Sequence, residues 1–134
     1  MTWRWVSQEA LLLLHGESLA EHGGKAGLRE PGLLDSALSR PLNLLAYGEP
    51  DTSDLASSYA TGIVKNHPFI DGNKRAAFLA VGLFLFLNGY RLQATQTDAT
   101  LAMWRLAEGV MTEAEFATWL RTHCVRRDSP QALS

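Results

Sequence analysis

Apolar residues recur along most of the chain three and four residues apart, which is the spacing of helices that bury one face. Six segments show this spacing: residues 10–20, 33–38, 55–64, 76–87, 101–110 and 116–120. Strand-like alternation is limited to Trp3-Arg4-Trp5, and the glycine-rich residues 21–29 form a loop that can fold as a small hairpin. The pattern predicts an all-α fold in one domain, residues 1–128, followed by a loose tail, residues 129–134.

Capping residues and helix breakers mark where these segments begin and end. The expected N-caps are Ser7, Ser53, Thr95 or Thr97, and Thr112, which forms a capping-box pattern with Glu115. Pro31 suits the first turn of the second helix. The expected helix ends are Gly23, Arg40-Pro41, His67-Pro68 and Asn88-Gly89.

Residues 76–87 are apolar on every side of the helix that they predict. The run is shorter than the ~20 residues that a bilayer span needs. It therefore predicts a helix surrounded by other elements. In the next segment we expect the core to include Leu101, Met103, Trp104, Leu106 and Val110.

Composition narrows the class of protein. With 46% hydrophobic and 19% charged residues, the 134-residue chain suits a globular domain with its own core. The net charge of −2 gives no bulk attraction to nucleic acid, so we expect no direct nucleic-acid partner. The lone Cys124 fits a reducing compartment, and no segment has the pattern of a signal peptide. These features predict a cytoplasmic protein without membrane association.

The densest chemistry lies in residues 67–75, which read His-Pro-Phe-Ile-Asp-Gly-Asn-Lys-Arg and directly precede the apolar run. Gly72 and Asn73 stand where the helical pattern begins, so backbone N–H groups there are free to bind an anion such as phosphate. Lys74 and Arg75 place two cations at a helix N-terminus, where positive charge is unfavourable unless an anion compensates it. The stretch therefore predicts a phosphate site.

Two further side chains indicate what the phosphate does. Asp71 beside a phosphate requires a divalent cation between the two anions, and Mg²⁺ binds in that manner, through carboxylates, phosphate oxygens and water. His67 can take a proton from a hydroxyl near neutral pH. Together these residues predict a group transfer from a magnesium nucleotide to a hydroxyl.

The stretch closely resembles the signature of the Fic/Doc superfamily, in which Fic proteins usually carry His-Pro-Phe-x-(Asp/Glu)-Gly-Asn-Gly-Arg-x-x-Arg. Residues 27–29 and 32–41 are similar to the segment before the core of Doc (death-on-curing) proteins, and residues 86–90 are similar to the end of their motif helix. The resemblance covers most of the chain. It implies a compact bundle of about six to seven helices around a buried motif helix.

The resemblance also implies a role for each matching residue. His67 corresponds to the general base, Asp71 to the magnesium ligand, and Phe69 to a buried anchor of the loop. The phosphate-binding segment, for ATP, corresponds to Gly72, Asn73, Lys74 and Arg75.

Two departures from the Fic pattern favour phosphate transfer over AMP transfer. Lys74 replaces the second glycine, and Phe78 stands where Fic proteins carry a second arginine that orients ATP for AMP transfer. Doc proteins share the lysine form and transfer the γ-phosphate to a threonine of elongation factor Tu. The resemblance thus implies a bacterial or phage-encoded toxin that acts as a protein kinase and inhibits translation.

The same resemblance implies control by a second chain. Fic/Doc enzymes are often held inactive by a helix of pattern Ser/Thr-x-x-x-Glu-Gly/Asn. Here Glu108-Gly109 matches the end of this pattern, but Trp104 stands at the position of the Ser/Thr, so we expect no built-in inhibitor. We expect instead a small antitoxin of the prevents-host-death type, which folds a helix into an apolar groove.

Other interpretations remain open at this point. A Fic-type AMP transferase and a non-catalytic binding module both retain the stretch at residues 67–75.

His15 and His22 match no common metal-site spacing. We expect Arg121, Arg126 and Arg127 to form a solvated basic end of the last helix.

Overall fold

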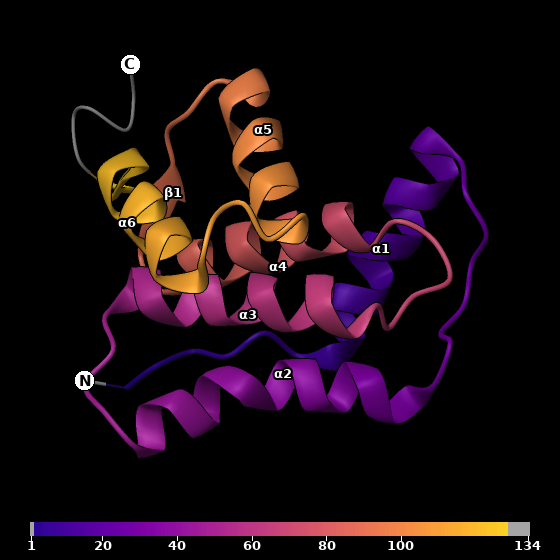
Figure 1. Ribbon diagram of the computed structural model, residues 1–134, viewed down its shortest axis with the longest axis horizontal. Helices are drawn as coiled ribbons and strands as arrows, with labels where there is room; N and C mark the ends of the chain where they lie inside the picture. Colours follow the sequence, from indigo (N-terminus) through magenta and orange to yellow (C-terminus); the bar gives the residue numbers. More distant parts are fainter. Residues whose placement is uncertain (1, 129–134) are drawn as a thin grey trace.

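The computed structural model describes residues 2–128, and within them the chain forms six helices and one pair of short strands (Figure 1). The helices are α1 (Gln8–His22), α2 (Pro31–Ala46), α3 (Thr52–Asn66), α4 (Asn73–Leu87), α5 (Gln96–Ala107) and α6 (Glu113–His123). The strands are β1 (Tyr90–Leu92) and β2 (Cys124–Arg126). The helical fold predicted from apolar spacing is confirmed, whereas the expected tail, residues 129–134, lies outside the described residues.

Helix α3 lies at the centre of the bundle. It packs against α2, α4 and α6, and Figure 1 shows α2 along one side of it and α4 along another. Residues 55–64 are all buried, although several of them are polar. Short side chains such as Ser57, Ala60 and Thr61 let the neighbouring helices approach closely, and the Ser57 hydroxyl donates to the Glu113 carbonyl of α6 at 2.7 Å.

Gly62 sets the distance between α3 and α2. A Cβ atom at Gly62 would lie 3.1 Å from the Ala37 Cα and 3.2 Å from the Ala37 carbonyl oxygen. Ala37 is itself fully buried. The two helix backbones are therefore in contact at this point, and no larger residue fits at Gly62 without moving one of them.

Helix α4 is buried along one face, and the expected burial on every side does not extend to all of its residues. Ala76, Ala80 and Phe84 are fully buried, whereas Phe78 is 37% exposed and Phe86 is 53% exposed. The apolar residues of α4 exceed what α3 and α1 can cover, so one flank of the helix remains open. Among residues 2–128 no helix combines the length and the apolar character needed to cross a membrane.

The helix ends follow the sequence prediction with two corrections. The caps at Ser7, Thr95 and Thr112 are confirmed, including the Thr112–Glu115 capping box. The predicted cap at Ser53 is wrong: Asp51 caps α3 and forms a capping box with Asp54. Helix α2 does not end at Arg40-Pro41 but continues through Pro41 to Ala46.

Neither expected strand region forms a hairpin or a strand. The strands β1 and β2 instead pair with each other in antiparallel register, with Arg91 opposite Val125. The loop at residues 21–29 makes a single bridge, between Leu28 and Phe69. Trp3 and Trp5 stack on Phe84 of α4, with ring centroids 6.1 and 5.9 Å apart.

Several side chains of α5 and α6 lie differently from their expected positions. Met103 and Leu106 are buried, but Leu101, Trp104 and Val110 are 42%, 49% and 68% exposed. Leu101 and Trp104 are exposed because the short helix α5 covers α3 and α4 with only one face, whereas Val110 lies in the turn after the end of α5. Arg121 is not merely solvated: its guanidinium pairs with Asp51 at 2.7 Å and Asp54 at 3.0 Å.

Candidate active site

The stretch at residues 67–75 forms the loop between α3 and α4 and the first turn of α4. His67 ends α3 with φ 49°, and among residues 2–128 it is the one non-glycine residue with positive φ. Its N–H donates to the Ile63 carbonyl at 3.0 Å, and Pro68 prevents the helix from continuing. Left-handed backbone at such a residue is strained and tends to occur at functional sites.

Asn73 holds this loop in shape from the first residue of α4. Its side-chain oxygen accepts from the Phe69 N–H at 3.0 Å, and its Nδ2 donates to the Phe69 carbonyl at 2.9 Å. The same Nδ2 lies 3.3 Å from His67 Nδ1. Because the Asn73 side chain is buried and occupied by the loop, only its backbone N–H is free to meet a ligand.

Phe69 is the apolar anchor of the loop. It is 1% exposed and stacks on the His15 ring of α1, with centroids 3.8 Å apart. On its other side the backbone pairs with the loop after α1, where the Arg29 N–H donates to the Pro68 carbonyl and the Ile70 N–H donates to the Gly27 carbonyl. The segment between α1 and α2 therefore runs beside the loop between α3 and α4, at the end of the molecule on the right in Figure 1.

Asp71 is held through both its main chain and its side chain. The Asp71 carbonyl accepts from His15 Nε2 at 2.9 Å. One carboxylate oxygen, Oδ2, accepts from the Lys25 N–H at 2.8 Å. Gly24, at φ 123°, lies between Asp71 and α1, because an added Cβ there would touch the Asp71 Cβ at 3.4 Å and would clash with the Leu19 side chain at 2.8 Å. The second carboxylate oxygen makes no hydrogen bond with the described residues.

The N-terminus of α4 is unusually open to a ligand. Its N-cap is Gly72, at φ 78°, which has no side chain to satisfy the free N–H groups of the first turn. Lys74 and Arg75 follow, and within residues 2–128 neither forms an ion pair. Free amides, the positive end of the helix dipole and two unpaired cations together favour an anion here.

Two adjoining cavities bring the predicted residues together. The first, of about 410 Å³, is lined by His67, Ile70 and Glu108 among others. The second, of about 440 Å³, is lined by His22, Gly23, Gly24 and Arg75 among others. Both are lined by Asp71, Gly72, Asn73 and Lys74. The six predicted site residues thus line two cavities that share four of them, with His67 lining only the first cavity and Arg75 only the second.

The donor set suits magnesium only together with a phosphate. Among the described residues no group of three or more His, Cys, Asp or Glu side chains could hold a metal by itself. Asp71 offers one free carboxylate oxygen beside the anion site. Mg²⁺ commonly binds through one or two carboxylates with phosphate oxygens and water completing its shell, so the residues fit that ion in a nucleotide complex.

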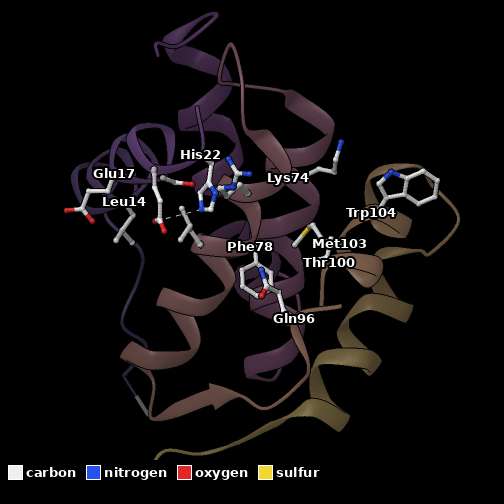
Figure 2. Close-up of a pocket in the computed structure, with 13 residues that line it drawn as sticks. Leu14, Glu17, His22, Lys74, Phe78, Gln96, Thr100, Met103 and Trp104 are labelled. Carbon is white, nitrogen blue, oxygen red and sulfur yellow. Dashed lines mark ion pairs between the residues drawn. The ribbon is translucent and has the colours of Figure 1, made fainter. Parts of the chain in front are cut away.

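A third hollow, which we call the α1–α4–α5 groove, opens beside the cations. Its volume is about 650 Å³, and Figure 2 shows Leu14 and Glu17 on one side, Met103 and Trp104 on the other, and Phe78 between them. Lys74 and Arg75 also line it. Two of the side chains that are more exposed than expected, Phe78 and Trp104, therefore line the same apolar groove.

Comparison with protein families identifies the family of the chain. Residues 5–85 match the model of the Fic/DOC family. The chain belongs to this family. The match includes α1, the loop after it and the whole stretch at residues 67–75, and it confirms the resemblance seen in the sequence.

Two curated relatives place the chain on the Doc side of the Fic/DOC family. It is 32% identical over 119 residues to the protein kinase doc of Escherichia phage P1, covering 88% of this chain and 94% of that protein. It is 40% identical over 75 residues to the toxin Doc of Mycolicibacterium smegmatis, covering 54% of this chain and 57% of that protein. The chain is therefore a homologue of a Doc protein kinase and of a Doc toxin.

The structure adds residues to the site that the sequence did not single out. His15 contacts Phe69 and Asp71, the Lys25 N–H holds the Asp71 carboxylate, and Glu108 lines the cavity of His67. No sequence signal identified the first two, because their roles depend on contacts with residues 46 and 56 positions away. In the sequence Glu108 belongs only to a partial match with the inhibitory pattern, and within residues 2–128 it forms no ion pair with Arg75.

Proposed function

We propose that this Fic/DOC family member is the toxin of a toxin–antitoxin system and a Doc-type protein kinase, which transfers the γ-phosphate of ATP to a Ser or Thr hydroxyl. The observation that carries the proposal is the uncapped N-terminus of α4, with Lys74 and Arg75, in cavities shared with His67 and Asp71. The likeness to a relative named a protein kinase, across 94% of that relative, supports the same reaction.

Each predicted residue has a proposed task. The backbone N–H groups of Asn73, Lys74 and Arg75 bind phosphate oxygens, and the Arg75 guanidinium forks onto them. Asp71 binds Mg²⁺ through its free carboxylate oxygen. When bound, Mg²⁺ neutralises charge on the phosphates and polarises the γ-phosphoryl group.

The proposed transfer forms one bond to the γ-phosphorus and breaks another. His67 takes the proton of the target hydroxyl as that oxygen bonds to the γ-phosphorus. The bond from this phosphorus to the β,γ-bridging oxygen breaks, and ADP leaves with the electron pair. Cationic and amide donors at α4 stabilise the charge on the departing phosphate.

AMP transfer is the alternative outcome, and two residues argue against it. Phe78, at the position of the second Fic arginine, is an apolar side chain in the groove and provides no phosphate contact. Lys74 carries a bulky side chain where Fic proteins have glycine. Both features leave the far phosphates of ATP without the contacts that expose the α-phosphate.

The direct test is the chemistry of a treated target. We propose elongation factor Tu as the protein substrate, on the basis of the Doc resemblance. The protein is incubated with this factor, ATP and Mg²⁺, and the factor is analysed by mass spectrometry. A phosphate on a Ser or Thr is the expected result, whereas an added AMP would assign the protein to the Fic-type transferases.

A matched pair of histidine variants separates the enzyme from a binding module. We expect His67→Ala to abolish both transfer and growth inhibition. His123→Ala is the control, because His123 lies on α6 and stacks on Trp119, outside both cavities. Growth inhibition that survives His67→Ala would favour a non-catalytic binding module.

We further propose that a small antitoxin of the prevents-host-death type binds the α1–α4–α5 groove with an amphipathic helix. The groove offers an apolar floor that includes Phe78, Leu79 and Met103, with Lys74 and Arg75 at its rim. Such a surface suits a helix with apolar anchors and an acidic side chain near the cations. An acidic group placed there would compete with phosphate for Arg75.

We propose that the toxin and its target meet in the bacterial cytoplasm.

A further inference from the structure

His15 is a buried, polar residue on a helix whose other buried residues include Leu11 and Leu19. It is 3% exposed. Its ring stacks on Phe69 at 3.8 Å between centroids, and its Nε2 lies 2.9 Å from the Asp71 carbonyl oxygen. A carbonyl only accepts hydrogen bonds, so Nε2 carries the hydrogen and donates it. His15 therefore makes a directed contact with the site as well as an apolar one.

The Asp71 carbonyl is a sensitive place for such a contact. It belongs to the peptide unit that joins Asp71 to Gly72, where the chain turns through φ 78° into α4. Gly72 lies so close to His15 that an added Cβ would be 3.1 Å from His15 Nε2. The hydrogen bond thus fixes the orientation of the peptide that joins the Asp71 Cα, which carries the carboxylate side chain, to Gly72, which directly precedes the first amide of the anion site.

A second hydrogen bond fixes the Asp71 side chain itself. The Lys25 N–H donates to Oδ2 at 2.8 Å, while the other carboxylate oxygen stays free. With the backbone held by His15 and one oxygen held by Lys25, the direction of the remaining oxygen is determined. A metal ligand gains affinity when neighbouring groups hold it in its binding orientation before the metal arrives.

We propose that His15 is a positioning residue, which through its Nε2–H bond to the Asp71 carbonyl aims the free Asp71 oxygen at the magnesium of the bound nucleotide. This inference rests on the proposed function, since it assumes that Asp71 binds Mg²⁺. It makes His15 necessary for the Mg²⁺ dependence of nucleotide binding, although His15 itself touches neither the metal nor the phosphates.

A purely structural role predicts a different pattern of variants. If His15 only fills space against Phe69, an aromatic replacement should preserve function and a non-aromatic one should not. His15→Phe keeps the ring and removes the donor. His15→Gln keeps a donor at the same distance along the side chain and removes the ring, whereas His15→Asn carries the same amide one bond too short to reach the carbonyl.

The experiment measures affinity for a non-hydrolysable ATP analogue with and without Mg²⁺, together with the melting temperature of each variant. We expect His15→Phe and His15→Asn to lose about 10- to 100-fold of the Mg²⁺-dependent gain in affinity, the usual cost of removing a group that supports a metal ligand. His15→Gln should retain most of the gain. Analogue affinity without Mg²⁺ should change little in all three variants.

Two results would overturn the proposal. One is an unchanged Mg²⁺ effect in His15→Phe; the other is an equal loss in His15→Gln and His15→Asn that follows their melting temperatures. Leu11→Ala, a destabilising change one turn earlier in α1, shows how far lowered stability alone affects binding. If His15→Phe does not fold, the Gln and Asn pair still decides, because both bury the same amide.

A readout without nucleotide keeps this proposal separate from the proposed function. The amide proton of Lys25 reports its hydrogen bond to the Asp71 carboxylate by NMR. Its resonance should move in His15→Phe and stay near the wild-type position in His15→Gln. Absence of Mg²⁺-dependent binding in the wild-type protein would defeat the proposed function, whereas an unmoved Lys25 resonance in His15→Phe would defeat the positioning role alone.

Discussion

Asp71 receives hydrogen bonds from residues 56 and 46 positions earlier in the chain, one to its carbonyl and one to its carboxylate. Both donors come from α1 and the loop after it. The residues of the stretch at 67–75 carry the proposed chemistry, and two groups outside it hold the carbonyl and the carboxylate of Asp71. At the scale of single residues, the site is therefore held in advance of any ligand, which is the arrangement that favours tight and oriented binding.

Replacing Asp71 tests its proposed task directly. We expect Asp71→Ala to abolish the Mg²⁺-dependent part of nucleotide binding, because the bridge between metal and loop is lost. Calorimetric titration of an ATP analogue with and without Mg²⁺ measures the effect. Asp35→Ala on the exposed side of α2 is the matched control. Nucleotide binding that keeps its full Mg²⁺ dependence in Asp71→Ala would remove Asp71 from the metal site.

Gly72 is required by its conformation and by its neighbour. At φ 78°, a side chain costs about 1–2 kcal/mol, and its Cβ would also lie 3.1 Å from His15 Nε2. We expect Gly72→Ala to lower the free energy of unfolding by at least this amount and to weaken nucleotide binding. Gly82→Ala is the control, since an added Cβ there meets nothing within 4 Å. Urea titration should show Gly82→Ala to be neutral or stabilising.

At the scale of elements, hydrogen bonds between distant helix ends determine features that local pattern did not show. Asp51 caps α3 and also accepts from the Arg121 side chain of α6 at 2.7 Å. Asp and Ser are about equally favourable N-caps, but Ser53 lies inside the helix and is 3% exposed. A capping preference known from peptides does not show which of two nearby candidates a distant arginine will favour.

This cap makes stability depend on pH. The Arg121 hydrogen bond, followed by the capping N–H of Asp54, lowers the pKa of Asp51 below its usual 3.8. A carboxyl with a lowered folded-state pKa contributes stability above its unfolded pKa, and this contribution is lost as pH falls through the folded value. We therefore expect Asp51→Asn to destabilise the protein at pH 7 and to differ less from wild type below about pH 3.

Urea midpoints measured at both pH values check the prediction for Asp51. Ser53→Ala serves as the comparison, because it removes the cap that sequence alone suggested. A loss in Ser53→Ala that is the same at both pH values, together with no loss at pH 7 in Asp51→Asn, would return the cap to Ser53.

The contact between α2 and α3 depends on one missing side chain. We expect Gly62→Ala to lower the free energy of unfolding by about 1–3 kcal/mol, because its Cβ would press on the Ala37 backbone, despite the better helix propensity of alanine. Chemical denaturation measures the change. Gly16→Ala on α1 has open space around the added methyl group and should be neutral or stabilising. Equal effects at both positions would mean that α2 can move aside at no cost.

At the scale of the whole molecule, the sequence predicted the helices, and the residues of the stretch 67–75 that line the two cavities, better than it predicted which side chains are buried. The 3.6-residue period gave the helices, and the residue types around Asp71 and His67 indicated phosphate and metal. Apolar content misled on burial, however: α4, the more apolar helix, keeps Phe78 and Phe86 exposed, while α3 with its serines is enclosed. The apolar period predicts which face of a helix is apolar, but it does not predict how many neighbouring elements cover the helix.

The α1–α4–α5 groove is the whole-molecule feature with the clearest functional test. We expect Phe78→Asp to weaken antitoxin binding at least tenfold, since a charge would enter the apolar floor. Titration of the purified antitoxin measures the change. Phe86→Asp is the control, because Phe86 lies on the same helix, is 53% exposed and does not line the groove. Equal weakening by both variants would move the antitoxin surface away from the groove.

The dependence of Asp71 on α1 also bears on how the protein behaves when it is cut. A fragment beginning at Pro50 would contain His67, Asp71 and Arg75, yet it would lack His15, Lys25 and the strand-like partner of Phe69. The complementary fragment would contain these three supporting contacts but would lack His67, Asp71 and Arg75. If the protein is the proposed toxin, we therefore expect neither fragment to be toxic by itself. Toxicity should return only when the two fragments assemble with each other.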